Sequence, residues 1–207
     1  MSSVVIAVID IGVGNIGSVL NMLKVLGAKG VLVSTAEQLE PAEKIILPGV
    51  GSFDEGMRQL DASGMRPMLD HKVKFDKTPI LGICLGMQLL CRGSDEGVRP
   101  GLSYVDAYCK RLASSAKSTI SIPHMRWNQV SISKETDLFK GLVKDNKFYF
   151  THSFGMVCDK ESDILGWTNY GDGFASACCS GNVFGVQFHP EKSHKFGKLL
   201  FKNFLGI

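Results

Sequence analysis

The chain has 207 residues, of which 44% are hydrophobic and 21% are charged, and its formal net charge is +3 at pH 7. This length suits one well-cored domain spanning residues 1–207, and the composition is ordinary for a globular protein. The basic excess is small and scattered, so no nucleic-acid partner is expected. The apolar run at residues 4–9 is too short to span a membrane, and no membrane partner is expected.

The first half of the chain alternates between strand-like and helix-like patterns. Strands are predicted at residues 4–9, 30–34, 44–47 and 79–83, and helices at residues 16–26, 53–60, 65–75 and from residue 85 onward. The strands are short continuous apolar runs, which is typical of a parallel sheet buried on both faces. The predicted fold class is therefore α/β, a three-layer sandwich whose largely parallel central sheet is flanked by helices.

The second half of the chain is richer in strands. They are predicted at residues 148–150, 164–167, 174–179 and 183–188, and the last two flank the predicted hairpin turn Ser180-Gly181-Asn182. An amphipathic helix is predicted from about residue 195 to residue 205. There is no repeat, linker or low-complexity tract that would divide the chain.

The segment Gly82-Ile83-Cys84-Leu85-Gly86 has the form G-x-C-x-G between a predicted strand and a predicted helix. This is the nucleophile-elbow pattern with cysteine in place of serine, in which glycines allow a sharp turn that exposes the sulfur. The helix start favours a thiolate, and the N–H of Leu85 points where an oxyanion would form. The alternative is a buried cysteine at an ordinary turn, but the strand before it and the helix after it favour a nucleophile.

A histidine and a carboxylate lie close together in Gln187-Phe188-His189-Pro190-Glu191. Pro190 disfavours the helical region for His189, so this segment is predicted to be extended. Extended residues two apart project to the same side, which would let Glu191 orient the imidazole. Cysteine, histidine and a carboxylate are the usual set for acyl transfer from an amide. Because an isolated His-x-Glu is more often structural, this interpretation depends on Cys84.

The other five cysteines form no C-x-x-C pair with one another or with Cys84, and a chain of this size does not need disulfides. Reduced thiols in a cytoplasmic protein are therefore predicted. The histidines form no metal motif such as H-E-x-x-H, so neither a metal nor another cofactor is expected.

Residues 12–17, Gly-Val-Gly-Asn-Ile-Gly, match the G-x-G-x-x-G pattern of dinucleotide sites. The next predicted strand ends at Ser34-Thr35, without the acidic residue that would hold a ribose. The pattern is therefore interpreted as a tight turn, in which Asp10 and Asn15 hold loop backbone near the site.

Longer stretches resemble the class I (triad) glutamine amidotransferases, most closely the glutaminase subunits of imidazole glycerol phosphate synthases from histidine biosynthesis. They follow the family's order and cover essentially the whole chain: residues 10–15, 47–53, 81–90, 123–125, 127–128, 149–150, 152–153 and 185–193. The resemblance implies hydrolysis of glutamine to glutamate and ammonia. It also implies that Cys84 is the nucleophile, His189 the acid–base group and Glu191 its partner.

The resemblance implies further roles around the nucleophile. Residues 48–51 resemble the segment that supplies the second oxyanion N–H, near Val50, after a flip of the backbone. Gly49, Gly51 and Gln88 resemble residues that bind glutamine. A strip resembles the interface with the synthase subunit, although the family usually has glycine at the position of Arg126: Asn15, His124, Arg126, Trp127, Asn128 and Lys192.

Ammonia must reach its acceptor quickly, because it is protonated near neutral pH and is then no nucleophile. The chain has no residues left for an acceptor domain. By resemblance the partner is a (βα)8-barrel cyclase subunit, in a heterodimer that makes imidazole glycerol phosphate and an aminoimidazole carboxamide ribonucleotide. The resemblance also implies that the isolated glutaminase is nearly idle.

Three alternatives stay open. Arg126 fits a paralogous glutaminase subunit that feeds ammonia to another acceptor enzyme, such as a surface-sugar amidotransferase. A non-enzymatic binding module on the same scaffold is the second, and the intact Cys84, His189 and Glu191 speak against it. A cysteine hydrolase or peptidase of similar architecture is the third, and Gln88 with the loop at residues 48–51 favours glutamine instead.

Overall fold

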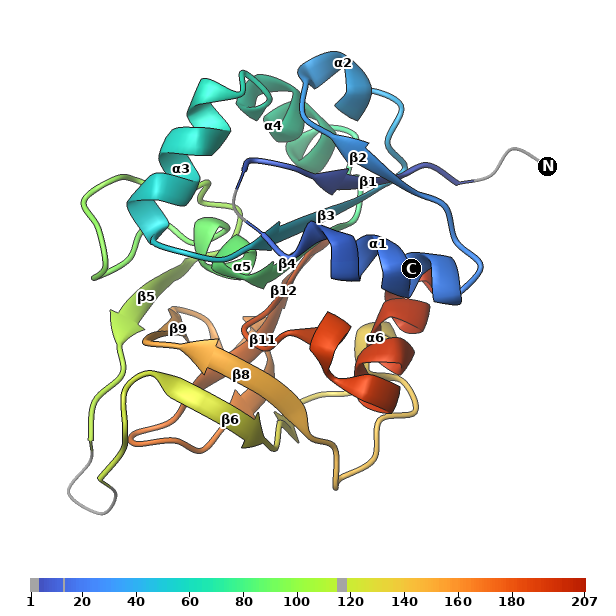
Figure 1. The fold of residues 1–207 in the computed structure, drawn as a ribbon. Coiled ribbons are helices and arrows are strands. Elements are labelled where there is room, and N and C mark those ends of the chain that lie inside the picture. The colour runs from blue at the N-terminus through green and yellow to red at the C-terminus, as the bar shows by residue number, and fades with distance from the viewer. Residues whose placement is uncertain (1–3, 13, 115–118) are drawn as a thin grey trace.

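The computed structural model describes residues 4–12, 14–114 and 119–207 (Figure 1). Five strands form the parallel half of its main sheet, in the order β2-β1-β3-β4-β12. They are β1 (Ile6–Ile9), β2 (Gly30–Val33), β3 (Lys44–Gly49), β4 (Ile80–Cys84) and β12 (Val183–Val186). The late strand β12 thus pairs with the strand that ends at Cys84, and Val186 lies opposite Ile83.

Antiparallel strands continue the main sheet beyond β12. They are β5 (Ala107–Arg111), β7 (Ser131–Ile132), β9 (Phe154–Cys158), β10 (Ile164–Thr168) and β11 (Phe174–Ser180). A separate antiparallel pair, β6 (His124–Asn128) and β8 (Phe148–His152), lies below the main sheet in Figure 1 and is called the β6–β8 ribbon here. The described residues also form short 3-10 helices: η1 (Asp137–Phe139), η2 (Glu161–Asp163) and η3 (Pro190–Lys192).

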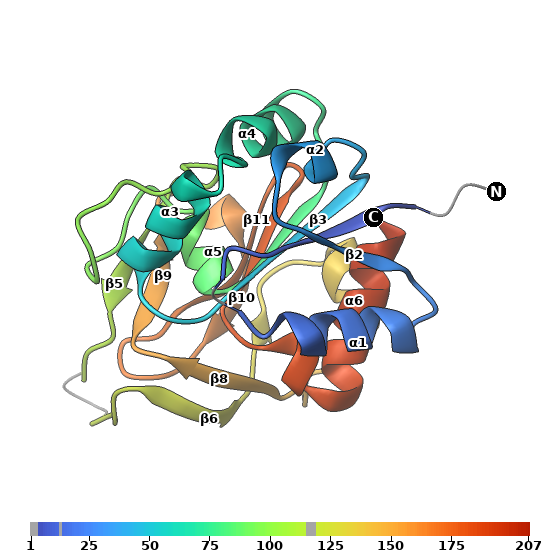
Figure 2. The same cartoon turned by 45° about the horizontal axis from the view of Figure 1, so that its top comes forward.

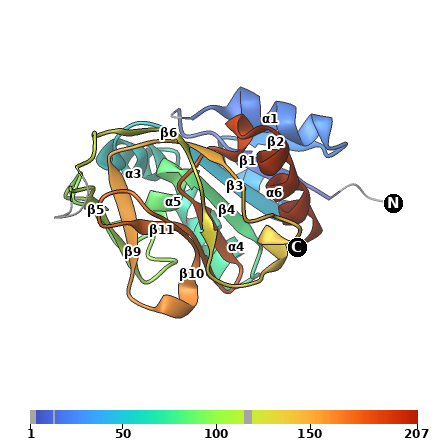
Figure 3. The same cartoon turned by 90° about the horizontal axis from the view of Figure 1, so that it is seen from below.

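Helices cover both faces of the parallel strands (Figures 1 and 3). On one face α1 (Ile16–Val25) and α6 (His194–Gly206) lie side by side, as Figure 2 also shows. The opposite face carries α3 (Phe53–Ala62), α4 (Arg66–Lys74) and α5 (Leu85–Leu89). The short helix α2 (Ala36–Leu39) packs against α4. The predicted α/β sandwich is confirmed, and its sheet is mixed because the second half of the chain adds antiparallel strands.

Alternate residues of each central strand feed two hydrophobic cores. In β1, Ile6 and Val8 pack with Phe201 of α6, whereas Ala7 and Ile9 pack with Met57 of α3. All six side chains are at most 2% exposed. This two-sided burial is why the strands read as continuous apolar runs in the sequence.

The structure extends one predicted strand and adds others. The sequence predicts that the third strand ends at Leu47, but β3 continues to Gly49 and pairs Pro48 with Ile83. Proline fits there because β3 pairs with β1 only as far as Ile46, so a backbone N–H on that side has no strand to bond. The sequence pattern misses β5, β6, β7 and β9. Polar or exposed residues interrupt the first three, and β9 is a short apolar segment that becomes a strand by pairing with β5 and β11.

The elbow brings the backbones of β3 and α5 into contact. A Cβ atom added to Gly86 would lie 1.7 Å from the carbonyl oxygen of Leu47. One added to Gly82 would lie 2.8 Å from the carbonyl oxygen of Gly86. These two glycines therefore permit the approach that the elbow pattern requires.

We expect Gly86→Ala to destabilise the fold, because the added methyl group overlaps the Leu47 carbonyl at 1.7 Å unless β3 and α5 separate. The free energy of unfolding, measured by urea denaturation, should fall by about 3 kcal/mol or more. Gly17→Ala is the matched control, because Gly17 lies inside α1 with nothing within 4 Å of its added Cβ. It should gain about 0.5–1 kcal/mol. Equal stability of the Gly86→Ala variant and the wild type would contradict this account.

Candidate active site

Cys84 is the last residue of β4 and precedes the first residue of α5. Its φ of 54° and ψ of −112° are strained for a residue other than glycine. Its side chain borders a cavity but is only 6% exposed. Leu85 begins α5, so its N–H has no partner within the helix and borders the same cavity. The strand–turn–helix geometry is that of a nucleophile elbow.

His189 and Glu191 form a buried ion pair beside this elbow. The His189 Nδ1 atom lies 2.8 Å from the Glu191 Oε1 atom, and both side chains are 2% exposed. Burial alone would lower the pKa of His189, but interactions with the Cys84 and Glu191 side chains outweigh it and raise the pKa to about 10. The imidazole is therefore protonated at neutral pH. It lines the same cavity as the Cys84 sulfur, and its buried Nε2 atom makes no hydrogen bond to another described residue.

The local backbone around this pair differs from the extended segment predicted from the sequence. His189 is extended, with φ −99° and ψ 93°, but Pro190–Lys192 form the 3-10 helix η3. The ring of Pro190 fixes φ near about −65°, which suits the first position of a helix, where no N–H is needed. This turn still places Glu191 against the imidazole.

The β6–β8 ribbon holds the backbone of His189 directly. The N–H of His189 donates to the carbonyl of Tyr149 over 2.9 Å, and the two residues form an isolated antiparallel bridge. The Ser193 hydroxyl donates to the carbonyl of His189 over 2.6 Å and accepts from the N–H of Tyr149 over 3.1 Å. The position of the imidazole therefore depends on β8 as well as on β12.

A cavity of about 270 Å³ opens in front of the Cys84 sulfur. It is lined by Val50, Gly51, Cys84, Leu85, Gln88, Glu96, Pro123, Thr151, His152, Ser153, Phe154 and His189. The structure thus brings together most of the residues predicted for oxyanion and substrate binding. Val50 is 40% exposed and Gly51 has a φ of +104°, a conformation that favours glycine.

Gly49 is the exception among those residues, because it lies buried in β3 and does not line the cavity. A Cβ atom added there would lie 3.0 Å from the N atom of Gly86. Gly49 thus allows β3 to approach the start of α5. Gln88 lines the cavity, and its side-chain amide donates to the Phe154 carbonyl over 3.2 Å and to the Gln187 side chain over 3.0 Å.

Glu96 also lines the cavity, although the sequence pattern does not indicate it. Its Oε2 atom accepts the N–H of Phe53 at the start of α3 over 2.9 Å. Asp54 in turn accepts the N–H groups of Val98 and Arg99 over 3.1 and 2.9 Å, which ties the Glu96 loop to α3. The available sequence signal is the pair Asp95-Glu96 shortly after the elbow helix, and it has no motif that singles out Glu96.

Two histidines are buried beside the cavity. The His124 Nδ1 atom lies 3.0 Å from the His152 Nε2 atom, and the His152 Nδ1 atom lies 2.8 Å from the Phe154 carbonyl. Burial and the charge of Arg126 lower the pKa of His124 to about 4. Burial, opposed by the Phe154 hydrogen bond, lowers the pKa of His152 to about 3. Both rings are neutral at physiological pH.

The predicted interface strip is largely exposed. Arg126 and Trp127 lie on the ribbon, with the Arg126 guanidinium 5.9 Å from the ring centre of Tyr170 and Trp127 stacked on His194. Lys192 is exposed, and Asn15 and Asn128 are partly buried. His124 corrects the prediction, because it is 0% exposed and stacks on the rings of Phe150 and Tyr170. It lies behind the strip and does not reach the surface.

The glycine-rich turn before α1 is tied to Asp10. The Asp10 Oδ1 atom accepts the N–H of Gly12 over 2.8 Å, and the Ser18 hydroxyl donates to the Asn15 Oδ1 atom over 2.9 Å. Val13 of this motif lies outside the described residues. These bonds support a local structural role for Asp10 and Asn15.

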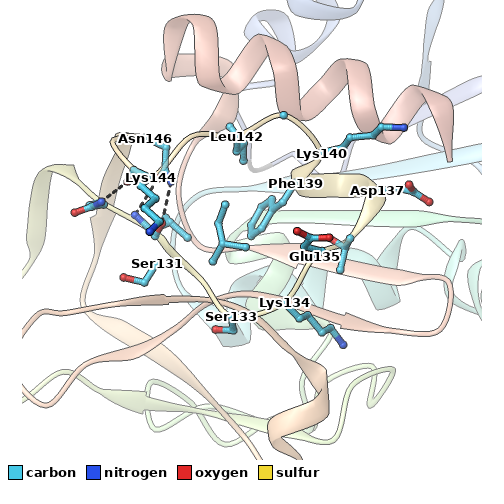
Figure 4. Close-up of a pocket in the computed structure, with 15 residues that line it drawn as sticks. Ser131, Ser133, Lys134, Glu135, Asp137, Phe139, Lys140, Leu142, Lys144 and Asn146 are labelled. Carbon is cyan, nitrogen blue, oxygen red and sulfur yellow. Dashed lines mark hydrogen bonds between the residues drawn. The ribbon is translucent and has the colours of Figure 1, made fainter.

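A larger cavity of about 1100 Å³ lies elsewhere, bordered by the loop between β6 and β8 (Figure 4). It is lined by Gln129–Asp137, Phe139–Leu142, Lys144 and Asn146. The buried Asn146 amide donates to the carbonyls of Val130 and Val143, both over 2.9 Å, and so closes the base of this loop. The cavity contains no member of the Cys84 cluster and offers no nucleophile–base pair.

Two other features bear on function in the part of the chain that the structure describes. There, no group of three or more His, Cys, Asp and Glu side chains is arranged to hold a metal ion. Within the same residues, none of the helices combines the length and hydrophobicity needed to cross a membrane.

Comparison with known proteins gives full-length matches. The family described as "Glutamine amidotransferase class-I" matches residues 7–207. A Pseudomonas aeruginosa protein, imidazole glycerol phosphate synthase subunit HisH 2, is 49% identical over 202 residues, covering 98% of this chain and 99% of the relative. The Bdellovibrio bacteriovorus subunit HisH is 48% identical over 203 residues, covering 98% and 100%.

Solved structures support the fold at lower sequence identity. The structure of PurLQS from Thermotoga maritima has a TM-score of 0.75 at 19% identity, covering 99% of this chain and 98% of that one. A crystal structure of a glutamine amidotransferase has a TM-score of 0.72 at 20% identity, covering 97% of each chain.

The two neutral histidines predict how stability depends on pH. Below pH 6.5 the unfolded chain binds a proton on each ring, whereas the folded chain keeps His124 neutral to about pH 4 and His152 to about pH 3. Unfolding therefore takes up protons, and the free energy of unfolding falls as the pH is lowered through this window. The limiting slope is about 1.4 kcal/mol per pH unit for each histidine.

We expect His124→Gln to depend less steeply on pH than the wild type, because one proton-binding group is removed from the unfolded chain. Urea denaturation from about pH 7.5 to about pH 4.5 measures the slope. His71→Gln is the control, because its imidazole is 60% exposed and lies outside the buried histidine pair. A His124→Gln variant with the wild-type slope would show that this ring is not held neutral by the fold.

Proposed function

The chain belongs to the class I glutamine amidotransferase family, and we propose that it is the glutaminase subunit of an imidazole glycerol phosphate synthase. In this role it hydrolyses glutamine to glutamate and passes the ammonia to a synthase subunit. The observation that carries the proposal is that Cys84 and His189 line one cavity, with Glu191 paired to His189 behind it, in a chain matched by the family over residues 7–207. The high identity to HisH subunits supports the histidine pathway.

The first half of the reaction forms a bond between the Cys84 sulfur and the carboxamide carbon of glutamine. The thiolate attacks, and the carbonyl electrons move to the oxygen, which the N–H of Leu85 stabilises. A second donor, the N–H of Val50, requires the loop at residues 48–51 to flip. His189 then protonates the nitrogen, the C–N bond breaks, and ammonia leaves a thioester on Cys84. The raised pKa of His189 supports this step, because the ring holds a proton at neutral pH.

The second half of the reaction regenerates the enzyme. His189, now neutral, removes a proton from a water molecule that attacks the thioester carbon. The C–S bond breaks, glutamate leaves, and the imidazolium and thiolate are restored. Glu191 keeps the ring oriented and stabilises its positive charge throughout, through the 2.8 Å contact to Nδ1.

Substrate selection follows from the cavity lining. Glutamine has an α-ammonium group, and the Glu96 carboxylate is the acidic side chain among the residues that line the cavity. We assign Glu96 to that ammonium group. Gln88 lies at the elbow side of the cavity, where the carboxamide must lie to meet Cys84. A peptide would need an open groove, whereas this cavity holds about 270 Å³.

The synthase subunit docks on the ribbon and the adjoining loops. Met125 is 60% exposed and Trp127 is 42% exposed, an apolar pair beside the cationic Arg126 and Lys192. Aromatic side chains and arginine dominate the binding energy of many interfaces. The proposed partner is a (βα)8-barrel cyclase in a heterodimer, and the proposed compartment is the cytoplasm, where all six free cysteines would stay reduced.

Arg126 favours one alternative acceptor. Its exposed guanidinium lies over Tyr170 on a strip where the family usually has glycine, so the docking surface is altered. A paralogous subunit that supplies ammonia to another synthase, such as a surface-sugar amidotransferase, would fit this change. Co-purification with either synthase separates the two.

We expect Cys84→Ala to lose glutamine hydrolysis completely, because no other group near His189 can form the thioester. Glutamate release is measured in the presence of the synthase subunit. The thermal unfolding transition should remain cooperative, since the substitution removes one buried sulfur. Cys179→Ala is the control, because this half-buried cysteine on β11 lies outside the cavity and should keep activity. Glutamate release at the wild-type rate by Cys84→Ala would overturn the assignment.

We expect glutamate release to rise at least ~10-fold when a cognate barrel cyclase and its nucleotide ligand are added, because the oxyanion loop must change conformation. Trp127→Ala should weaken the complex by about 30-fold, measured by titration calorimetry. Trp167→Ala is the matched control, because this tryptophan is 36% exposed on β10, outside the strip. Equal activity with and without the cyclase would contradict gating, and equal affinity of both tryptophan variants would contradict the docking surface.

A further inference from the structure

The carbonyl of Phe154 fixes the direction of the hydrogen bonds around it. It accepts from the Gln88 Nε2 atom over 3.2 Å and lies 2.8 Å from the His152 Nδ1 atom. A carbonyl oxygen can only accept, so both of these nitrogens must carry hydrogen. The Gln88 amide orientation and the His152 tautomer are therefore set by one backbone atom.

The first consequence concerns Gln187, which lies between Gln88 and the Cys84 sulfur. The Gln88 Nε2 atom also lies 3.0 Å from the Gln187 Oε1 atom, and its second hydrogen makes that bond. Gln187 must therefore present its oxygen to Gln88 and its NH2 group to the other side. There the Gln187 Nε2 atom lies 3.7 Å from the Cys84 sulfur, and the Gln187 side chain is 0% exposed.

The second consequence concerns the two histidines linked to the Phe154 carbonyl. Because His152 Nδ1 carries the hydrogen, its Nε2 atom accepts from His124 Nδ1 over 3.0 Å. His124 Nε2 is then an acceptor and lies 3.2 Å from the Asn128 amide nitrogen. Each side chain in this hydrogen-bonded series therefore has one permitted orientation. The Gln187 amide, which directs its NH2 group at the sulfur, cannot be flipped without losing these bonds.

The sulfur has two polar neighbours of opposite effect besides His189. The Thr151 carbonyl, 3.9 Å away, can accept from a thiol but repels a thiolate. The Gln187 NH2 group can donate to a thiolate. A donor aimed at a buried anion stabilises it strongly because solvent is excluded. Gln187 thus favours the reactive form of Cys84, in opposition to Thr151.

We propose that Gln187 donates a hydrogen bond to the Cys84 sulfur and stabilises the thiolate, with its orientation set by Gln88 and the Phe154 carbonyl. This inference rests on the proposed function only for its value to the reaction, since the hydrogen bond exists without substrate. The stabilised thiolate raises the fraction of Cys84 that can attack at neutral pH.

The test measures the reactivity of Cys84 against pH without glutamine. The rate of iodoacetamide alkylation is followed for the Cys84 peptide by mass spectrometry in the full chain. Gln187→Met keeps the length but removes the donor, and the pH midpoint of reactivity should rise by about one unit. Below the midpoint this is a roughly tenfold slower reaction. Gln187→Glu keeps an oxygen for Gln88 but removes the donor, and should shift the midpoint at least as far.

The other titratable groups facing the sulfur are the His189–Glu191 pair, His152 and Glu96, and they are identical in all variants. Gln187→Glu adds a carboxyl group, so Gln187→Met is the decisive variant. Thr168→Val is the matched control, because it removes a buried 2.8 Å hydrogen bond to Ser176 but no contact of the sulfur. Its midpoint should equal that of the wild type. Folded Gln187 variants with an unchanged midpoint would overturn the proposal and leave Gln187 as a packing residue.

A measurement on the wild type covers the case in which the variants do not fold. The Gln187 side-chain NH2 resonances should titrate with the same midpoint as Cys84 alkylation, and resonances that do not change would overturn the proposal. A chain that shows the alkylation shift but hydrolyses no glutamine with a cyclase would reject the proposed function alone.

Discussion

The structure depends on one backbone contact, the approach of Gly86 in α5 to the Leu47 carbonyl of β3. This contact presses the start of α5 against the end of β3, so the Cys84 sulfur, the Leu85 N–H and the loop at residues 48–51 meet at one cavity. A side chain at position 86 would part the two elements, and the loop at residues 48–51 would move away from the Cys84 sulfur and the Leu85 N–H. The positive φ of Cys84 persists because this packing holds the turn from both sides.

Sheet topology supplies the second half of the site. Strand β12 is parallel to β4 on one edge and antiparallel to β11 on the other, so it is where the two halves of the sheet join. Its carboxyl end therefore lies beside the carboxyl end of β4, and His189 meets Cys84 across 105 residues of sequence. Sites at the carboxyl ends of parallel strands are the general outcome of this architecture.

The sequence predicts those parts of the fold and the site that depend on residues close together in the chain. The central strands are fully buried, and the elbow glycines answer a steric demand, so both leave clear patterns at residues 4–9 and 82–86. The ribbon is indicated only in part, because residues 148–150 of β8 have a strand pattern, whereas the mostly exposed β6 becomes a strand only by pairing with β8. The positions of Glu96 and Gln187 also leave no pattern in the sequence. Glu96 is held by its hydrogen bond to the start of α3, and Gln187 is oriented by Gln88. The interface strip resembles the family's, yet its first ribbon residue, His124, is a core side chain.

The ribbon has two faces that share one backbone. Its outer face carries Trp127 and its strand partner Tyr149, whose carbonyl accepts the N–H of His189. Arg126 lies on the opposite face with its strand partner Phe150, which packs inside. Redesign of the outer face to bind a different protein will therefore also affect the reaction. A substitution that moves β6 by a fraction of an ångström also moves β8, and with it the imidazole of His189. Variants at these positions will therefore change in partner preference and in turnover together.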